Sequence, residues 1–347
     1  MLSITTLIVY STSYISPANY PFLGFLSGFI PFFWVFNLFF FFTWLRFIDR
    51  RALLSGLTLL VGWNFLTASF SIGWMGSSTS KKSFGVLSYN VRVFNAYKHL
   101  ELEKPGTSAH MINWLSKHPA EIKCFQEFYF SKTIPSLNTL HKIGKSKKYT
   151  YQLVYSESLR FKNQYIGLAL FSKLPVVKSG DFPLNKPWTQ RGVFMDILWE
   201  KDTLRIINVH LQSLSLDDRS LFDWQHISHT YRAYRIAYQK LRNGFQSRGQ
   251  QVDYLEKFIL QSPHKIILCG DLNDLPYSYT YQRLKKYFYN AFEVRGSGFN
   301  FTYKGKIPFL RIDNQFYSPG IRILHFETLY QHKESDHFPI LANYELK

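Results

Sequence analysis

The sequence predicts an α/β domain in which two β-sheets pack as a sandwich with flanking helices, a four-layer αββα arrangement, preceded by an N-terminal transmembrane helical segment. Residues 1–76 carry only four charged side chains, whereas charged and apolar residues mix throughout the rest. From Phe84 onward, short runs rich in Val, Ile, Leu, Phe and Tyr alternate with turns and helical stretches. Roughly 265 residues patterned in this way favour two packed sheets with helices outside them.

Three uncharged stretches fill the N-terminal segment, at 2–15, 22–45 and 52–71. A helix over 22–45 would be about 36 Å long, which exceeds the roughly 30 Å hydrocarbon core of a bilayer. Neither of the two longer stretches has the polar face of a surface helix. We therefore expect two or three transmembrane helices, with a pair of buried core helices as the alternative.

A basic loop between the two longer stretches predicts their orientation. Arg46, Arg50 and Arg51 lie there, and the positive-inside rule favours the cytoplasmic side for such a loop. The chain after Ser71 would then emerge on the extracytoplasmic side, through a small polar linker at 77–83. Adding protease to sealed spheroplasts tests this orientation, because protection of the large domain would contradict it.

The charge of the chain is strongly positive, at +18. Three arginines and one aspartate give residues 1–76 a charge of +2, which leaves +16 for the rest. Such a domain favours polyanions such as nucleic acid, anionic lipid or phosphorylated metabolites, although a surface suited only to solubility is the alternative. Cys124 and Cys269 both fall in apolar strand patterns, so we expect two buried core residues and no disulfide framework.

The large domain, 84–347, contains nine predicted strands and three predicted helical regions. Pro119 should close the first helix, and Gly244 and Gly249 should interrupt the second. The strands are expected at 84–89, 121–126, 151–155, 166–172, 193–200, 203–210, 265–269, 311–317 and 338–344, and the helical regions at 107–118, 221–261 and 273–289.

Polar residues stand at the ends of five of these apolar runs. The clearest case is Ile266 to Leu272, where an apolar run meets Gly270 and then presents Asp271 and Asn273. Gly270 should permit a close approach of the backbone. The other groups are Asn90, Gln126 with Glu127, His210, and Asp336 with His337. Taken singly, each has a structural explanation, such as a turn or a solvated strand end, but five in one chain predict a shared pocket.

The chemistry of such a pocket points to metal-assisted hydrolysis of a phosphoester. A divalent cation neutralises phosphate oxygens and developing charge, and Mg²⁺ prefers the oxygen ligands that Glu127, Asp271 and Asp336 supply. An Asp or His can orient and deprotonate the attacking water. Imidazole and amide N–H groups can stabilise the transition state.

Seven motifs stand in the order found in one known family. They are Leu87-Ser88-Tyr89-Asn90, Phe125-Gln126-Glu127, Gly167 to Lys173, Asn208-Val209-His210-Leu211, Gly270 to Asp274, Arg311-Ile312-Asp313 and Ser335 to Ile340. The chain from about Phe84 resembles the endonuclease/exonuclease/phosphatase superfamily, which includes pancreatic deoxyribonuclease, abasic-site endonucleases, neutral sphingomyelinases and inositol-polyphosphate phosphatases. With its hydrophobic segment, it looks like a bacterial membrane-anchored branch in the inner (cytoplasmic) membrane.

The resemblance implies a metal site and a substrate partner for it. Glu127 matches the principal metal ligand, with Asn90 beside it and Asp336 completing this site or a second one. The expected metal is Mg²⁺, with Mn²⁺ or Ca²⁺ as alternatives. The expected partners are the lipid bilayer and a phosphoester in nucleic acid, phospholipid or inositol phosphate.

The resemblance also implies roles in catalysis and substrate binding. Asp271 would orient or deprotonate water, Asn273 would hold the scissile phosphate, and His210 would donate to a phosphate oxygen or act as general acid. His337 would be an acid/base group oriented by Asp313, and Arg191 would contact phosphate. One departure from the family follows Asp313, where Asn314-Gln315 replace the usual bulky apolar run.

Two functions from other classes stay open. A catalytically silent module that binds polyanions would keep the fold but normally loses a metal ligand or a histidine, and none is missing here. A structural membrane component would use its helices for assembly, with Asn37 and Asn64 as interhelical hydrogen-bonding groups.

Overall fold

The computed structural model describes residues 1–73, 82–97, 106–144, 149–155, 164–186, 190–214, 227–305 and 309–346. Most of the predicted linker at 77–83 lies outside these ranges. The chain forms two compact units. The helical unit consists of Met1–Phe70, Gln212–Asp253 and Asn273–Lys286, and the sandwich unit consists of Ser71–Leu211, Tyr254–Leu272 and Tyr287–Lys347.

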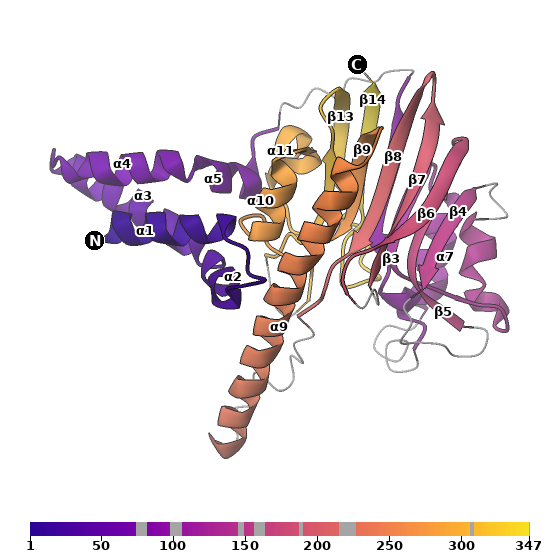
Figure 1. Ribbon diagram of the computed structural model, residues 1–347, viewed down its shortest axis with the longest axis horizontal. Helices are drawn as coiled ribbons and strands as arrows, with labels where there is room; N and C mark the ends of the chain where they lie inside the picture. Colours follow the sequence, from indigo (N-terminus) through magenta and orange to yellow (C-terminus); the bar gives the residue numbers. More distant parts are fainter. Residues whose placement is uncertain are drawn as a thin grey trace. The chain divides into compact units, whose positions relative to one another are not determined.

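The sandwich unit contains two six-stranded sheets (Figure 1). The first has the order β13 (Ile321–Thr328), β14 (Ile340–Leu346), β2 (Phe84–Asn90), β3 (Ile122–Ser131), β5 (Gln164–Ser172) and β4 (Thr150–Tyr155). The second has the order β10 (Tyr289–Asn290), β12 (Asp313–Tyr317), β9 (Lys265–Asp271), β8 (Asp202–His210), β7 (Arg191–Trp199) and β6 (Val176–Pro183). The two-sheet α/β prediction is therefore confirmed.

Each sheet contains one parallel pair among antiparallel neighbours. β2 runs parallel to β3, and β8 runs parallel to β9. All nine predicted strands are present, with ends shifted by a few residues. Of the strands in the two sheets, β6, β10 and β13 were not predicted. β6 consists mostly of exposed and half-buried residues with no regular burial alternation. A register shift between Ile323 and His325 interrupts the period of β13.

Two apolar cores hold the sandwich unit together. One lies between the sheets and includes Val86 and Cys124 from the first sheet and Ile206 and Cys269 from the second. The other packs the outer face of the first sheet, including Leu87, against α7 (Thr107–Lys117). Adjacent strand residues point to opposite faces, so one strand supplies both cores. Both cysteines are buried and free, as predicted.

Amide side chains tie the two sheets together across the first core. Asn208 of β8 donates to the carbonyls of Phe125 (2.9 Å) and Ala169 (3.1 Å) in the first sheet. Gln315 of β12 donates to the carbonyls of Val86 and Ile340, each at 3.1 Å. The polar pair that departs from the family pattern after Asp313 therefore has a structural use, because buried amides need such partners.

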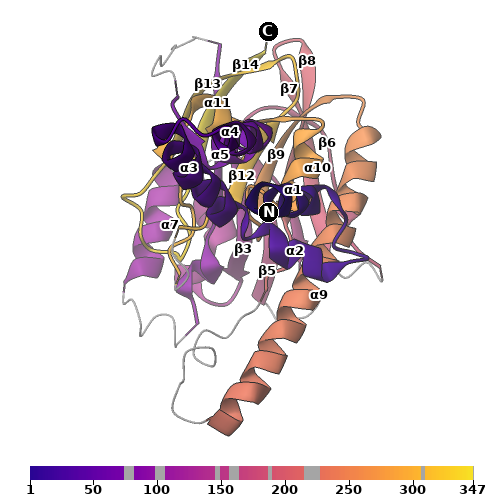
Figure 2. The same ribbon diagram turned by 90° about the vertical axis from the view of Figure 1, so that its left-hand side faces the viewer.

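The N-terminal helices of the helical unit gather into one group (Figure 2). The two longer predicted helices, 22–45 and 52–71, are each broken. The first divides at Gly28-Phe29 with a 43° bend, and the second divides at Gly62 with a 53° bend. Pro31 opens the helix after the first break, where its missing N–H is tolerated. The elements are α1 (Leu2–Ser11), η1 (Thr12–Tyr14), α2 (Pro21–Ser27), α3 (Ile30–Arg46), α4 (Arg51–Val61) and α5 (Trp63–Ser69).

Within the described parts of the chain, no single helix is long and apolar enough to cross a bilayer, although the two bent pairs meet those criteria jointly. The polarity of these helices is inverted relative to a water-soluble bundle. Asn37 is fully buried and donates to Thr6 Oγ1 at 2.7 Å and to the Phe33 carbonyl at 2.9 Å. The exposed side chains include Phe32 (62%) and Phe39 (63%).

One long helix, α9 (Ile227–Leu260), occupies most of the predicted helical region at 221–261. The predicted interruption at Gly244 and Gly249 is wrong, because α9 continues through both. Close packing explains why glycine occupies both positions. A Cβ at Gly244 would lie 2.6 Å from Leu214 Cδ2, and one at Gly249 would lie 2.7 Å from the Ala18 nitrogen.

The remaining elements are short. Helix α10 falls within the predicted helical region at 273–289, after a turn. These elements are α10 (Tyr279–Lys285), α11 (Ala291–Arg295), β1 (Phe70–Ser71), β11 (Gly298–Phe299), η2 (Arg92–Asn95), η3 (Pro135–Leu137) and η4 (Leu140–Gly144).

Replacing Gln315 by leucine should lower the free energy of unfolding by about 2 kcal/mol, because buried carbonyls of the first sheet lose a donor. Chemical denaturation followed by circular dichroism measures this change. The same substitution at exposed Gln239 of α9 is the control and should change stability by less than about 0.5 kcal/mol. Equal effects of the two substitutions would show that the cross-sheet hydrogen bonds contribute little.

Candidate active site

Strand ends from both sheets meet at one edge of the sandwich unit. In the first sheet, Asn90 ends β2 beside Gln126 of parallel β3. In the second, His210 ends β8 beside Asp271 of parallel β9. Hydrogen bonds of Asn90 to Glu127 and Asp271 show that the two edges coincide.

Asn90 links the two sheets at this edge. Its Nδ2 donates to Asp271 Oδ2 at 3.1 Å and to Glu127 Oε1 at 3.3 Å. Its Oδ1 accepts from the Arg92 backbone N–H at 3.1 Å. Asn90 is buried, so these contacts fix the separation of the two carboxylates.

Glu127 reaches the site because β3 is irregular there. The pairing of β3 with β5 shifts register between Phe125 and Phe128, and Glu127 has a positive φ of 52°. A non-glycine residue in this region is under local strain that the surroundings must offset. The irregularity turns Glu127 out of the ladder, and its side chain is 36% exposed.

Asp271 occupies the centre of the cluster. Gly270 precedes it with φ of 150°, and a Cβ there would lie 2.1 Å from the Val209 carbonyl oxygen, so only glycine fits. The Asp271 side chain is 1% exposed. Its Oδ2 lies 3.5 Å from His210 Nε2 and 3.7 Å from His337 Nε2. His210 Nε2 also lies 4.0 Å from Glu127 Oε1.

Asp313 and His337 form a buried pair on the other side of Asp271. Antiparallel pairing sets Asp313 opposite Asp271, and His337 Nδ1 lies 2.8 Å from Asp313 Oδ2. Burial opposes the charged imidazolium, but the carboxylates of Asp313 and Asp271 outweigh it and raise the pKa of His337 to about 10. At neutral pH His337 is therefore a cation that can donate from both ring nitrogens.

Asp336 is held at the same edge by its neighbours. Ser335 Oγ donates to the Asn90 carbonyl at 2.8 Å and lies 3.2 Å from Asp336 Oδ1. Arg92 Nε lies 3.4 Å from Asp336 Oδ2. The sequence analysis missed Arg92, although it stands only two residues after Asn90. It lies in a run of four residues with positive φ, Arg92 to Asn95, which no local sequence pattern indicated.

Two predicted residues are placed differently from this cluster. Arg191, at the start of β7, pairs its guanidinium with the Asp181 carboxylate, so its charge already has a partner. Asn273 follows Asp271 by two residues, begins a segment of the helical unit and has φ of 50°. Asparagine tolerates this left-handed conformation better than most residues.

The donor atoms suit a hard divalent cation. Glu127, Asp271, Asp313 and Asp336 supply carboxylate oxygens, and Asp313 Oδ1 is buried with no hydrogen-bond partner among the residues that the structure describes. Atoms of Asp271, Asp313 and His337 lie within 4.8 Å of one another, close enough to share one ion. His337 Nδ1 already contacts Asp313 Oδ2 at 2.8 Å, so only its Nε2 could face an ion there. Glu127, which is partly exposed, offers a second carboxylate at which a cation could bind.

Asn90 could join a cation site only after a local change. Its nitrogen, not its oxygen, faces Glu127 and Asp271. Ligation would require the amide to turn over, which exchanges two groups of nearly equal size.

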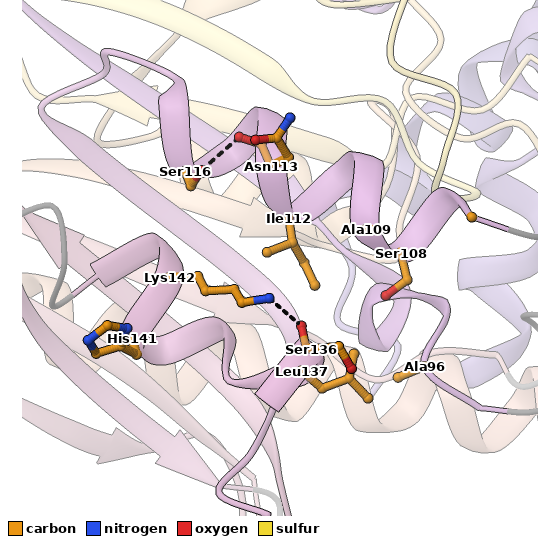
Figure 3. Close-up of a pocket in the computed structure, with 11 residues that line it drawn as sticks. Ala96, Ser108, Ala109, Ile112, Asn113, Ser116, Ser136, Leu137, His141 and Lys142 are labelled. Atoms are coloured by element: carbon orange, nitrogen blue, oxygen red, sulfur yellow. Dashed lines mark hydrogen bonds between the residues drawn. The ribbon is translucent and has the colours of Figure 1, made fainter. Parts of the chain in front are cut away.

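A groove of about 750 Å³ lies elsewhere in the sandwich unit, between α7 and residues 135–144 (Figure 3). Its lining includes Ser108, Asn113, Ser136, His141 and Lys142. It contains none of the predicted site residues and no carboxylate among its described lining. It therefore lacks the acidic ligands found at the strand ends.

Solved structures with this fold cover most of the chain. An endonuclease/exonuclease/phosphatase family protein from Bacteroides thetaiotaomicron is 16% identical, with a TM-score of 0.55 over 78% of this chain and 100% of that one. The human Nocturnin catalytic domain with bound sulfate is 14% identical, with a TM-score of 0.53 over 78% and 97%. A mannosyl-6-phosphatase from Bacteroides thetaiotaomicron is 16% identical, with a TM-score of 0.51 over 75% and 99%.

Comparison with family models divides the sequence in two. A model described as a domain of unknown function matches residues 1–69. The model of the endonuclease/exonuclease/phosphatase family matches residues 87–337, which include every predicted site residue. No curated protein matches the chain. Because this match covers most of the chain and the matched residues form the two-sheet fold, the chain belongs to the endonuclease/exonuclease/phosphatase family.

Proposed function

We propose that the protein is a membrane-anchored phosphodiesterase that depends on a divalent cation, with Mg²⁺ as the expected ion. The observation that carries the proposal is the convergence of Glu127, Asp271 and the Asp313–His337 pair at one edge of the sandwich. Four carboxylates and two histidines at one edge suit hydrolysis of a phosphoester better than passive binding of an anion, which carboxylates would repel.

Glu127 and Asp336 would hold the cation, with Asn90 beside them. When bound, the cation would neutralise phosphate oxygens and the charge that develops on them. That Glu127 and Asp336 share one ion stays a prediction.

The protein's own groups would move protons and orient the substrate. Asp271 would orient the attacking water or accept its proton, because its carboxylate lies at the centre of the cluster. His337, held as a cation by Asp313, would donate to a phosphate oxygen and stabilise the transition state. His210 would donate to the phosphate or protonate the leaving group, and Asn273 would hold the phosphate.

The N-terminal helices support a membrane location. In water, exposing Phe32, Phe39 and Leu57 while burying Asn37 would be unfavourable. In a bilayer the same arrangement is favourable, because lipid covers the exposed apolar side chains and the buried polar side chains form hydrogen bonds with one another. The bent helix pairs would then cross the membrane as broken spans or enter it as loops.

An aromatic surface beside the site favours a lipid headgroup as substrate. Phe299 (59% exposed) and Phe309 (72% exposed) flank Phe301, with ring centroids 6.2 and 5.1 Å from it. This stretch adjoins the site, since the Phe338 N–H donates to the Thr302 carbonyl at 2.7 Å. Exposed apolar surface of this kind suits the glycerol and acyl region of a lipid.

Nucleic acid is the second candidate substrate. The charge of +18 on the whole chain favours it, since release of counterions rewards a basic surface.

Alanine at Glu127 or at Asp271 should lower Mg²⁺-dependent turnover by about 100-fold or more, because each removes a carboxylate that binds the cation or the water. Turnover would be measured on phosphatidylinositol, sphingomyelin, DNA and an inositol phosphate, with and without chelator. Exposed Glu327→Ala and Asp202→Ala are matched controls and should keep wild-type rates. Wild-type turnover in both site variants would rule out this mechanism.

Serine at Phe32, Phe36 and Phe39 together should release the chain from membranes, because it removes apolar surface that lipid would cover. The measurement is the fraction that stays in the membrane pellet after extraction with alkaline carbonate. Serine at Ile134, Val177 and Leu198, exposed apolar residues of the sandwich unit, is the control. Release of the wild-type chain by carbonate would contradict the membrane location.

A further inference from the structure

Two strands that end at the site continue directly into the helical unit. β8 ends at His210, and Gln212 already belongs to the helical unit. β9 ends at Asp271, and the helical unit resumes at Asn273. Contacts that fix Gln212 or the residues after Asn273 are therefore only two or three residues along the chain from His210 and Asp271, the candidate catalytic residues.

Arg248 of α9 contacts both of these continuations. Its Nη1 donates to the Gln212 carbonyl at 3.0 Å, and its Nε lies 3.3 Å from Asp274 Oδ2. The side chains of Arg248 and Asp274 are only 1% and 6% exposed. The 3.3 Å contact is an ion pair in which Arg248 Nε makes no hydrogen bond with the described residues, and separating the two buried groups would leave each charge uncompensated, which is costly.

A second residue on the same face of α9 strengthens this connection. Gln251 Oε1 accepts from the Gln212 backbone N–H at 2.9 Å. Together, Arg248 and Gln251 bond to both backbone polar groups of Gln212. The segment after His210 is therefore fixed in position as well as in orientation.

The same turn of α9 also packs against the N-terminal segment. A Cβ at Gly249 would lie 2.7 Å from the Ala18 nitrogen and 3.0 Å from Pro17 Cγ. Phe245, whose ring lies 4.8 Å from the Arg248 guanidinium carbon, packs against Gly24 of α2. The turn therefore contacts the N-terminal segment and the two continuations at once.

We propose that the turn Arg248–Gln251 is a positioning element that couples the packing of the N-terminal helices to the loops that follow His210 and Asp271. Arg248 is its central positioning residue, and it acts through Gln212 and Asp274 without contact to the substrate. The catalytic consequence rests on the proposed function, whereas the coupling itself does not. A change in how the N-terminal helices pack, such as insertion into a bilayer, would thereby alter how Asn273 is held.

The first test measures the coupling without reference to catalysis. Hydrogen–deuterium exchange is followed by mass spectrometry on the full chain in detergent, in peptides that cover 16–20, 211–214 and 272–276. Arg248→Met combined with Asp274→Asn removes both charges at once, so no buried charge is left unpaired. Exchange at 211–214 and 272–276 should rise about 10-fold or more, since the fixing contacts are lost. Arg242→Met, exposed on the same helix, should leave exchange unchanged.

Gly249→Val tests whether a change in the packing of the N-terminal segment reaches the loop after Asp271. Its side chain would displace Ala18, so exchange should rise at 16–20 and also at 272–276. Gln250→Val, exposed on the next position, controls for the lower helix propensity of valine. A rise confined to 16–20 would overturn the coupling, as would unchanged exchange in the Arg248→Met/Asp274→Asn variant.

The second test uses bis(p-nitrophenyl) phosphate with Mg²⁺ as the probe. Misplacing a phosphate-holding loop by about 1 Å can cost roughly 100-fold in rate, so the double variant should show a lower kcat and a raised KM. Partial unfolding would instead lower the apparent kcat and leave KM unchanged, which would reject the positioning role. If the wild-type chain fails to hydrolyse any phosphoester offered, the proposed function fails, while the exchange data still decide the coupling.

Discussion

The whole site depends on one constraint, which is that a parallel strand pair in each sheet ends at the same edge of the sandwich. The amide of Asn90 crosses that edge, with hydrogen bonds of 3.1 and 3.3 Å to Asp271 and Glu127. Antiparallel pairing of β12 with β9 sets Asp313 opposite Asp271. Antiparallel pairing of β14 with β2 brings the segment before β14, which contains Asp336 and His337, close to Asn90 at the end of β2. Amide side chains that cross between the sheets, such as that of Gln315, fix the position of one sheet against the other.

Charge balance explains why these groups can remain together. Each carboxylate at the edge has a cationic or amide neighbour, and the most deeply buried ones flank His337. Glu127 is the most exposed of these carboxylates, and its side-chain partners among the described residues are the Asn90 amide at 3.3 Å and His210 at 4.0 Å. Negative charge is therefore least compensated beside Glu127, which is where a cation would lower the energy most.

Strand positions and the motif-bearing residues were predictable from the sequence because apolar runs and turn residues report burial directly. Besides the strands β6, β10 and β13, three features were not. The breaks at Gly28 and Gly62 depend on how helices pack, which hydropathy does not record. Continuity of α9 through Gly249 depends on a close neighbour, Ala18, distant in sequence. Arg92 reaches Asp336 from an unusual left-handed turn, so no spacing rule could place it at the site.

The position of the cation tests the account most directly. Crystals of the protein soaked with Mn²⁺ would show the ion through its anomalous scattering. The account predicts one strong peak bound to the Glu127 carboxylate, with Asp336 or Asn90 as a further ligand. A peak centred among Asp271, Asp313 and His337, or no peak at this edge of the sandwich, would contradict it.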